Sequence, residues 1–501
     1  MSFARIYSRG RIGIDAPLVS VEVFISKGLP SLSIVGLPET TVRESRDRVR
    51  SALIHSGFEF PKYRVVVNLG PADLPKEGGR FDLAIAIGML AASGQIPLDN
   101  LDQYEFIGEL SLSGELQSVP GALASSLACC NSERSLILPE QNLKEASLYQ
   151  KAKSFGAKDL DSVCQFFLED EPLMQSSSSA SGLNKAPDYT YQHNLSEVYG
   201  QPFARKALEI AAAGQHHLLM IGSPGSGKTM LAERLITIQP KLSTEESLEI
   251  ARLYSCRGLW NEPLWGSRPF RAPHHTSSSA ALVGGGSKPL PGEISLAHKG
   301  VLFLDELPEF ERRALEVLRE PLESRHITLS RAALQISYPA NFQLVAAMNP
   351  CPCGYRDDPV KKCECPPQAI ARYQSKLSGP LMDRIDLQVR VPPTHHKTLL
   401  EQQEPGESSQ LVQERVQIAA DIQLERQGCY NSQLKGDQLK IHGAMTSEAQ
   451  EFLIKASDTL CLSARSLHRV IRVARTIADL KKEHKIEKKH ITQSLSFRLD
   501  Q

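Results

Sequence analysis

The sequence lacks the long hydrophobic run that a membrane-spanning helix requires, because no stretch approaches about 18 consecutive apolar residues. Its first ten residues, MSFARIYSRG, also lack the apolar centre of a signal peptide. We therefore expect a cytoplasmic protein with no membrane partner. Ten cysteines in 501 residues do not make a disulfide scaffold, so a reducing compartment would keep them as thiols or metal ligands.

The chain has no excess charge of either sign, since 57 basic side chains balance 57 acidic ones. Net charge therefore gives no general attraction to DNA or anionic lipid, and any nucleic-acid site must be local. The hydrophobic content of 41% is ordinary for a globular protein, so a packed core is expected. A chain of 501 residues is long enough for about three domains.

One stretch matches the P-loop pattern GxxxxGK[ST] at every fixed position. A buried-strand pattern precedes it at 217–221, and a helix pattern follows at 230–235. Glycines in such a loop turn backbone N–H groups toward phosphate oxygens, and the helix N-terminus adds partial positive charge. We expect ATP here, with Thr229 holding Mg²⁺. The predicted nucleotide-binding residues are Gly222, Ser223, Pro224, Gly225, Ser226, Gly227, Lys228 and Thr229.

Polar residues follow two further apolar strand patterns, at 301–304 and 342–348. Strands that are apolar throughout suit a parallel sheet covered on both faces, and such sheets bind ligands at their carboxyl ends. Asp305 would hold Mg²⁺, Glu306 would polarise the water that attacks the γ-phosphate, and Asn349 would hydrogen-bond that water or the phosphate. A simple turn residue is the alternative interpretation of Asn349.

A lone arginine, Arg384, lies in a polar stretch before the strand pattern at 387–391. An arginine that reaches the γ-phosphate from a neighbouring subunit can raise the rate by roughly 10³ to 10⁵, which would make turnover depend on a ring. A surface ion pair with Asp383 or Asp386 is the alternative.

The C-terminal tail predicts a helix that begins after an N-cap at Ser463 and carries an apolar face. Four arginines recur on another face at three- and four-residue spacing, namely Arg465, Arg469, Arg472 and Arg475. A solvated surface and a functional role are equally open for the last three.

Strand and helix patterns also alternate along residues 1–168, which indicates a separate α/β or α+β domain. Its strand patterns are at 19–25, 31–35 and 64–69, and its helix patterns are at 41–56 and 82–92. Residues 169–190 are rich in serine and have no apolar periodicity, so they are predicted to be a flexible linker. The nucleotide module would then occupy 191–392, and a helical domain 393–501.

Four cysteines form two C-x-C pairs, Cys351 with Cys353 and Cys363 with Cys365. Four thiolates can close a tetrahedral structural zinc site, and the glycine and prolines around them suit tight turns. Zinc ribbons usually carry C-x-x-C pairs, so the spacing is less specific, and buried thiols are the alternative. We expect about one Zn²⁺ per chain, bound within 351–365.

The long interval between Lys228 and Asp305 leaves room for an insertion, and 268–300 is its expected content. A second projection, at 327–337, alternates as a β-hairpin with Arg331 near its turn. Lys288 in the first and Arg331 in the second are candidate DNA contacts, with ordinary loop charge as the alternative.

Together, Lys228, Asp305–Glu306, Asn349, Arg384 and Arg465 resemble Walker A, Walker B, sensor 1, arginine finger and sensor 2 of an AAA+ ATPase. The phrases RPFRAPHHT (268–276), PGEISLAH (291–298) and AAMNPCPCG (346–354) narrow the likeness to the magnesium-chelatase-like branch, and within it to the bacterial ComM (YifB-type) family. The resemblance runs essentially from end to end.

The resemblance implies a homohexameric motor on single-stranded and branched DNA, which promotes branch migration of recombination intermediates in natural transformation, with recombination proteins as candidate partners. In rings of this kind, loops such as those bearing Lys288 and Arg331 face the central pore. The resemblance also implies an AAA+ module with a helical lid, preceded by an α+β Lon-protease-like domain of the ribosomal-protein-S5 type. A chelatase-type motor acting on a protein or inserting a metal is the alternative function.

The Lon-like likeness raises a peptidase as a further alternative. The protease family carries its nucleophilic serine where this sequence has Arg80, and its lysine where this sequence has Ala124. Without nucleophile or base no Ser-Lys dyad can form, so we expect a catalytically dead domain.

Overall fold

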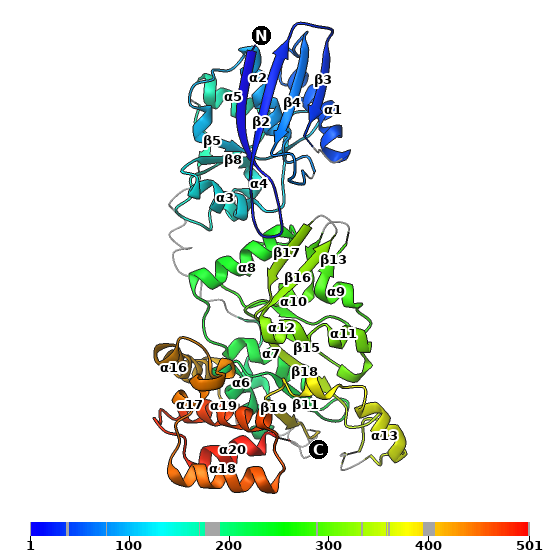
Figure 1. The fold of residues 1–501 in the computed structure, drawn as a ribbon, viewed down its shortest axis with the longest axis vertical. Helices are drawn as coiled ribbons and strands as arrows, with labels where there is room; N and C mark the ends of the chain where they lie inside the picture. The colour runs from blue at the N-terminus through cyan, green and yellow to red at the C-terminus, as the bar shows by residue number, and fades with distance from the viewer. Residues whose placement is uncertain are drawn as a thin grey trace. The chain divides into compact units, whose positions relative to one another are not determined.

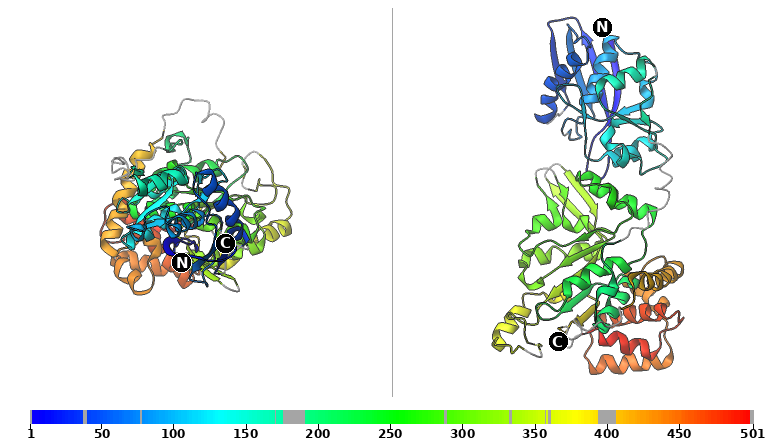
Figure 2. Two further views of the ribbon diagram at one scale, coloured as in Figure 1. Left: turned by 90° about the horizontal axis from the view of Figure 1, so that it is seen from above. Right: turned by 180° about the vertical axis from the view of Figure 1, so that it is seen from behind.

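The computed structural model describes residues 2–36, 40–76, 78–169, 171–175, 191–286, 289–331, 334–356, 358, 361–393 and 406–498. They form two compact units (Figures 1 and 2). The first comprises Met1–Pro187, Ser243–Ser267 and Ser330–Tyr338, and the second comprises Asp188–Leu242, Arg268–Leu329 and Pro339–Gln501. Each unit has its own sheet and its own hydrophobic core.

An eight-stranded mixed sheet forms the centre of the first unit, in the order β10-β9-β8-β5-β1-β2-β4-β3. The strands β1–β2, β2–β4 and β9–β10 pair antiparallel, and the remaining neighbours pair parallel. The strands are β1 (Ser2–Arg9), β2 (Leu18–Ser26), β3 (Ser31–Val35), β4 (Arg64–Gly70), β5 (Tyr104–Phe106), β8 (Ser135–Pro139), β9 (Ser154–Ala157) and β10 (Met174–Gln175), and a separate small sheet pairs β6 (Glu109–Leu110) with β7 (Leu116–Gln117).

The helices of the first unit explain why its sheet alternates buried and exposed residues. Helix α2 (Asp82–Ser93) is buried along nearly its whole length and packs on β1 and β2. In β2, every second residue from Val19 to Ile25 faces this core, as a period of two requires. The other helices are α1 (Thr40–His55), α3 (Ala122–Asn131), α4 (Glu140–Ala146), α5 (Leu160–Leu168) and α8 (Thr244–Cys256).

Two features differ from the predicted domain boundaries. Met174 and Gln175 pair with β9, so the sheet of the first unit continues into the segment expected to be a linker. Residues 243–267, expected within the nucleotide module, belong to the first unit, where α8 packs on α3. Local sequence pattern cannot show either contact, because both join segments distant in the chain.

The second unit is built on a parallel five-stranded sheet, in the order β12-β15-β18-β11-β19. Its strands alternate between two cores. Leu218 and Met220 face a core shared with α6, α7, α16 and α19, whereas Leu219 faces a core shared with α9, α10, α11 and α14. Burial on both faces accounts for the continuously apolar strands β11 (Leu218–Ile221) and β15 (Val301–Leu304), and for β18 (Gln343–Met348), which is apolar after its first residue. The two outer strands, β12 (Phe270–Arg271) and β19 (Leu387–Arg390), also carry polar residues.

The elements around this sheet carry the loops predicted from the sequence. The helices are α6 (Pro202–Gly214), α7 (Lys228–Ile238), α9 (Ser279–Val283), α10 (Glu293–Leu296), α11 (Arg312–Glu316), α12 (Arg319–Ser324), α13 (Pro367–Gln374) and α14 (Gly379–Met382). Two hairpins project, one of β13 (Gly284–Gly285) with β14 (Leu290–Pro291), and one of β16 (His326–Arg331) with β17 (Leu334–Pro339). Both lie where the sequence predicted projections.

Residues 406–498 are helical, as predicted for the tail, and are orange to red in Figure 2. Ser463 caps α19 by accepting a hydrogen bond from the Ser466 amide, which confirms the predicted start of that helix. The helices are α16 (Ser409–Gln427), α17 (Gly436–His442), α18 (Ser447–Thr459), α19 (Ala464–Leu480) and α20 (Lys488–Ser496). Within the described part of the chain, no helix is both long and apolar enough to span a bilayer.

Candidate nucleotide site

The loop between β11 and α7 requires glycine for two different physical reasons. Gly225 and Gly227 have φ of 77° and 87°, a left-handed conformation that is costly for other residues. At Gly222, a Cβ atom would lie 2.3 Å from the Val391 carbonyl oxygen, so only hydrogen fits there. The three glycines thus let the backbone curl at the carboxyl end of β11, where a P-loop is expected.

Lys228, the first residue of α7, points back into this loop. Its Nζ donates to the carbonyl oxygens of Gly222 at 2.8 Å and Ser223 at 3.0 Å, and to Asn349 Oδ1 at 3.2 Å. Burial lowers the pKa of Lys228, against the opposing effect of Asp305 and Glu306. The structure therefore brings together the predicted Walker A lysine and the predicted sensor at the end of β18.

The loop also contains buried polar atoms that suit a phosphate ligand. Ser223 and Ser226 are almost fully buried, and neither Oγ has a hydrogen-bond partner within the described residues. Leaving a buried hydroxyl unpaired costs about 1–3 kcal/mol, which a phosphate oxygen at this position would offset. The residues present therefore fit a triphosphate, with the ammonium of Lys228 as its nearest full positive charge.

Thr229 and Asp305 meet beside the loop. Thr229 Oγ1 donates to Asp305 Oδ2 at 2.9 Å, and Asp305 Oδ1 accepts from the Glu306 amide at 2.9 Å. A hydroxyl and a carboxylate are the hard oxygen donors that Mg²⁺ prefers, so this pair fits the ion that accompanies a nucleotide. Because β15 and β11 are parallel strands of one sheet, their carboxyl ends place these two side chains together.

Glu306 has a strained backbone and an unforeseen partner. Its φ and ψ are 51° and 45°, a left-handed conformation that non-glycine residues seldom adopt. Its carboxylate Oε2 lies 3.2 Å from His275 Nδ1. The sequence analysis singled out the phrase containing His275 only as a family marker, since nothing local in the sequence shows that it reaches Glu306.

The four cysteines predicted to bind metal converge just after Asn349. Their sulfur atoms all lie within 4.8 Å of one another, with Cys351 Sγ 3.3 Å from Cys353 Sγ and 3.6 Å from Cys363 Sγ. Sulfur ligands at 2.3 Å in a tetrahedron around zinc would be about 3.8 Å apart. The cluster therefore fits one Zn²⁺ with small adjustments, Cys365 being the fourth ligand.

The cysteine turn also touches the nucleotide loop. Gly354, with φ of 85°, lies so near Pro224 that a Cβ atom would be 2.6 Å from the Pro224 Cδ atom. Within the cluster, a hydrogen bond from the Tyr355 amide lowers the pKa of Cys353 to about 6. For Cys363, the amide of Cys365 lowers the pKa, but burial and the neighbouring thiols outweigh it and raise the pKa to about 12.

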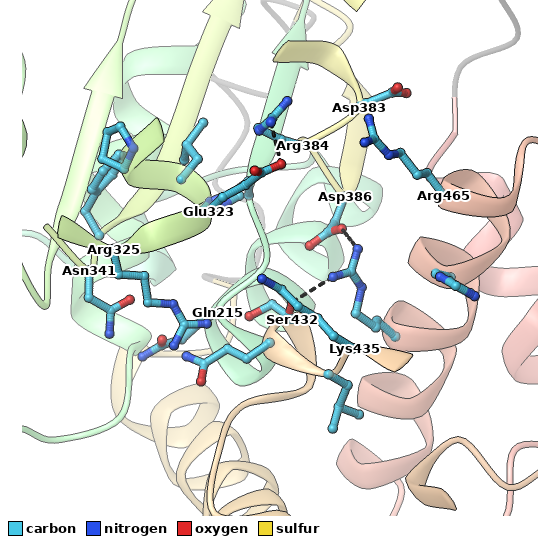
Figure 3. A pocket seen from close by; sticks show the side chains of 18 of the residues that line it. Gln215, Glu323, Arg325, Asn341, Asp383, Arg384, Asp386, Ser432, Lys435 and Arg465 are labelled. Carbon is cyan, nitrogen blue, oxygen red and sulfur yellow. Dashed lines mark hydrogen bonds and ion pairs between the residues drawn. The ribbon is translucent and has the colours of Figure 1, made fainter. Parts of the chain in front are cut away.

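Arg384 and Arg465 lie at the other edge of the sheet. Both line a pocket of about 300 Å³ whose wall includes His217 and Asp386, the residues that immediately precede β11 and β19 (Figure 3). The P-loop follows the carboxyl end of β11, whose four residues span about 13 Å. Neither arginine therefore lies beside the P-loop of its own chain. For Arg465, the sequence alone could not show this position.

Arg384 forms an ion pair within this pocket. It donates to Glu323 Oε1 and to the Pro380 carbonyl oxygen, rather than to Asp383 or Asp386. Arg465 is exposed at the start of α19 and points toward the loop that carries Asp383 (Figure 3). The same pocket contains Arg325, Lys435 and Arg472, so its lining combines several cations with three carboxylates.

Two of the remaining three arginines of α19 join the lid to the residues that precede β19. Arg469 donates to the carbonyl oxygens of Met382 and Ile385, at 3.1 and 2.8 Å. Arg472 donates to the carbonyl oxygen of Ser432 and to the carboxylate of Asp386. Arg475 is buried and pairs with Asp479 at 3.0 Å. Their spacing left open two interpretations, a solvated helix surface or a functional role. The solvated surface is wrong for Arg469 and Arg475, because both are buried.

Asp386 is the centre of this junction. His216 Nδ1 lies 2.9 Å from Asp386 Oδ2, and His216 Nε2 lies 2.8 Å from Thr476 Oγ1 on α19. Burial would raise the pKa of Asp386, but Arg472 and His216 outweigh it and lower the pKa below its usual range. Burial lowers the pKa of the adjacent His217 to about 4, so that ring is neutral near pH 7.

The two candidate DNA contacts are placed unequally. Lys288 lies outside the described residues. Arg331 ends β16, beside the turn of its hairpin as predicted, and only its backbone is described. Their contact with DNA stays a prediction.

In the first unit, the positions expected for a protease nucleophile and base are close together. Arg80 Nη2 donates to Ser125 Oγ at 3.0 Å, and Arg80 Nη1 to the Pro120 carbonyl oxygen at 3.3 Å. Ala124 precedes Ser125 in α3. Arg80 thus contacts the helix that carries Ala124.

Comparison with known proteins agrees with this arrangement. Residues 21–142 match the family "Subunit ChlI of Mg-chelatase", residues 194–399 match "Magnesium chelatase, subunit ChlI", and residues 406–498 match "Magnesium chelatase, subunit ChlI C-terminal". The chain is 48% identical over 501 residues to the competence protein ComM of Haemophilus influenzae, covering 99% of this chain and 98% of that protein. The chain belongs to the ComM (YifB-type) family.

Another ComM-family relative, the uncharacterized protein YifB of Escherichia coli, is 47% identical over 499 residues, covering 99% of this chain and 97% of that protein. A weaker similarity connects the N-terminal part with Lon protease 2 of Bacillus subtilis, 28% identical over 180 residues, or 31% of this chain and 32% of that protein. The predicted fold class is confirmed: a magnesium-chelatase-like AAA+ module of an ATPase family, with a helical lid and a Lon-like domain before it.

Proposed function

We propose that this protein is an ATP-driven hexameric DNA translocase that promotes branch migration of recombination intermediates during natural transformation. One observation carries the proposal furthest. The predicted phosphate-binding residues lie at the carboxyl ends of the strands of the parallel sheet, and the predicted arginine finger lies at the amino ends of the same strands. A single subunit therefore supplies two halves of two different sites, which only a ring can close.

The half-site at the carboxyl edge would bind and hydrolyse ATP. Lys228 and the loop amides would bind the phosphates, and Thr229 and Asp305 would hold Mg²⁺, which neutralises the charge that develops on the leaving phosphate. Glu306 would polarise the attacking water, with Asn349 orienting it. The close approach of Lys228 to Asn349 and of Thr229 to Asp305 supports this assignment.

The half-site at the amino edge would act on the neighbouring subunit. Arg384 would reach the neighbour's γ-phosphate, and because Arg465 lines the same pocket, it would serve the same nucleotide. In the free subunit, Arg384 is paired with Glu323. Ring assembly would exchange that carboxylate for a phosphate, which offers the arginine a stronger charge-assisted contact.

DNA as the substrate is supported by the relative from Haemophilus influenzae, which carries the name competence protein and matches nearly the whole chain. Competence is the uptake of external DNA, so a motor of that family has DNA to process. The hairpin β13–β14 belongs to the ATPase unit, and the hairpin β16–β17 begins there, as loops that track a phosphate backbone would. Lys288 and Arg331 remain our candidates for that contact.

We further propose that Cys351, Cys353, Cys363 and Cys365 hold a structural Zn²⁺. A zinc ion with four thiolate ligands has no open coordination position and contributes folding energy only. The close approach of Gly354 to Pro224 supports a structural role beside the nucleotide loop. The ion would thereby fix the turn on which the P-loop rests.

The test combines two measurements on the full-length protein, ATP hydrolysis with and without single-stranded or four-way-junction DNA, and migration of a labelled junction. We expect DNA to stimulate ATP hydrolysis. We also expect the labelled junction to migrate and separate into its product duplexes only when ATP is present. If DNA neither binds nor stimulates hydrolysis, while ATP is still turned over, the motor acts on another substrate. The chelatase-type alternative would then be favoured.

A further inference from the structure

Residues 10–17, which we call the β1–β2 loop, form a closed turn in the first unit. Ile12 and Asp15 exchange two backbone hydrogen bonds of 3.0 Å each. Between them, Gly13 has φ of 60°, a conformation that is costly for other residues. Two later segments of the chain that belong to the same unit, 243–267 and 330–338, both contact this loop.

Two arginines attach the first of these segments to the β1–β2 loop. Arg252 on α8 donates to the Ile14 carbonyl oxygen at 3.1 Å and to Asp15 Oδ1 at 3.2 Å. In the other direction, Arg11 of the loop donates at 3.0 Å to the carbonyl oxygen of Cys256, the last residue of α8. Hydrogen bonds from a charged donor are stronger than neutral ones, so α8 and the loop should move together.

The same segment also docks on α3, the helix that carries Ala124. The amide of Gly121, the N-cap of α3, donates to the Ser255 carbonyl oxygen at 2.9 Å. Trp265 is almost fully buried in a cluster that includes Leu123 of α3 and Ala251 of α8. The first unit therefore holds 243–267 through a packed apolar contact as well as through the two arginines.

Strand β17 of the β16–β17 hairpin contacts the tip of the β1–β2 loop. Ile336 and Tyr338 are both buried, and a Cβ atom at Gly13 would lie 2.6 Å from Ile336 Cγ2. The side chain of Tyr338 also hydrogen-bonds to that of Cys256. The hairpin strand, the β1–β2 loop and the end of α8 therefore form one packed cluster within the first unit.

A short connection joins α8 to the P-loop helix. Helix α7 ends at Ile238, and Ser243 already caps α8, so only four residues lie between them. Among these, Pro240 is buried, and its carbonyl oxygen accepts a hydrogen bond from Arg268 Nε at 2.9 Å. A connection this short and this constrained has little slack, so a displacement of α8 reaches α7, which begins at Lys228.

We infer that the first unit couples the β16–β17 hairpin to the nucleotide site, with the β1–β2 loop as the coupling element. Movement of the hairpin on a bound DNA strand passes through β17 and the β1–β2 loop to α8, and from α8 to α7. The domain that lacks a Ser-Lys dyad thereby makes ATP hydrolysis respond to DNA. The inference rests on the proposed function, since it takes DNA as the ligand that displaces the hairpin.

ATP hydrolysis by full-length Arg252→Glu, with and without single-stranded DNA, tests the coupling. The substitution removes both hydrogen bonds to the loop and places a negative charge beside Asp15. The rate without DNA should stay near that of the wild type, whereas the stimulation by DNA should fall by at least about fivefold. Adding Asp15→Arg to the same chain should recreate the pair and restore the stimulation. Arg43→Glu, at an exposed position of α1, is the charge-matched control. Full stimulation in Arg252→Glu would overturn the inference.

Ile336→Ala tests the hairpin end of the coupling and decides the question if Arg252→Glu does not fold. It removes the side chain that packs on Gly13, so it should lower the stimulation by DNA while the rate without DNA persists. The double variant should lose no more stimulation than Arg252→Glu alone, because both substitutions interrupt one route. A further loss in the double variant would reveal two separate routes and contradict the inference.

Tryptophan fluorescence separates this inference from the proposed function. Both tryptophans of the chain, Trp260 and Trp265, lie in the docked segment. A non-hydrolysable ATP analogue should therefore change their emission in the wild type without DNA, but not in Lys228→Ala. If DNA does not stimulate the wild type, the proposed function fails, while a changed emission still supports the coupling of α7 to α8. Unchanged emission in protein shown to bind the analogue would overturn the inference.

Discussion

Lys228 Nζ lies 3.2 Å from Asn349 Oδ1, so the end of β18 and the start of α7 share one hydrogen bond. Two residues that are 121 positions apart thus meet at one point of the sheet edge. A γ-phosphate bound there would contact both. The first prediction concerns this pair.

Lys228→Ala should abolish ATP hydrolysis and strongly weaken ATP binding, because the loop then has no full positive charge to offer the phosphates. Asn349→Ala should instead bind ATP and hydrolyse it slowly, since it removes only an orienting group. Fluorescent-nucleotide binding and phosphate release measure the two effects. Lys455→Ala, at an exposed position of α18, should behave as the wild type. Equal loss of ATP binding in both site variants would contradict the division of roles.

Arg384→Ala should lower turnover by roughly 10³-fold or more while ATP binding persists, as expected for an arginine that acts only in the transition state. The decisive experiment mixes it with Lys228→Ala. Neither protein hydrolyses ATP alone, but in mixed rings an intact P-loop meets an intact Arg384, so part of the activity should return. Arg313→Ala, on the exposed side of α11, is the control. No recovery in rings shown to contain both variants would exclude action between subunits.

Cys363→Ser should lose the metal, and elemental analysis should show about one zinc per wild-type chain and none in the variant. Its Tm should fall, because the turn that packs on Pro224 loses its crosslink. Cys461→Ser removes an exposed thiol in the turn between α18 and α19 and should keep both zinc and Tm. Wild-type protein purified without chelator and found free of metal would remove the site.

Asp386→Asn should lower the Tm near neutral pH, because loss of one member of a buried charge pair costs about 3–5 kcal/mol. The pKa of Asp386 is lowered in the folded protein, so its contribution is present above the unfolded value of about 4 and declines as pH falls below it. The Tm gap between wild type and variant should therefore narrow from pH 5 to pH 3. A gap independent of pH would show that its charge does not stabilise the fold. Thermal melts across this range provide the measurement.

The sequence predicted the strands and loops of the nucleotide edge because their signals are local. The glycines around Lys228 and the apolar run before Asp305 each occupy a few consecutive residues. The same holds for Ser463, whose capping role depends only on the next three residues. Convergence of the four cysteines also followed from their spacing, since fifteen positions leave few other ways to fold a tight turn.

What the sequence could not predict depends on contacts between distant segments. Nothing near Arg465 shows that it shares a pocket with Arg384, because α19 reaches the sheet through a long chain of intervening helices. The partner of Glu306 is hidden for the same reason, as His275 lies in the expected insertion, about 30 residues earlier in the chain. The membership of 243–267 in the first unit likewise rests on packing of α8 against α3.

Helix α19 belongs to two hydrophobic cores at once. Val473 and Ile477 pack with the sheet, whereas Val470 and Ala474 pack with α18 and α20. The lid cannot move away from the sheet without exposing one of these cores, so Arg465 keeps its position relative to Arg384. Each subunit would therefore present a rigid surface to its neighbour. The movement that accompanies ATP hydrolysis would then have to occur between subunits and not within one.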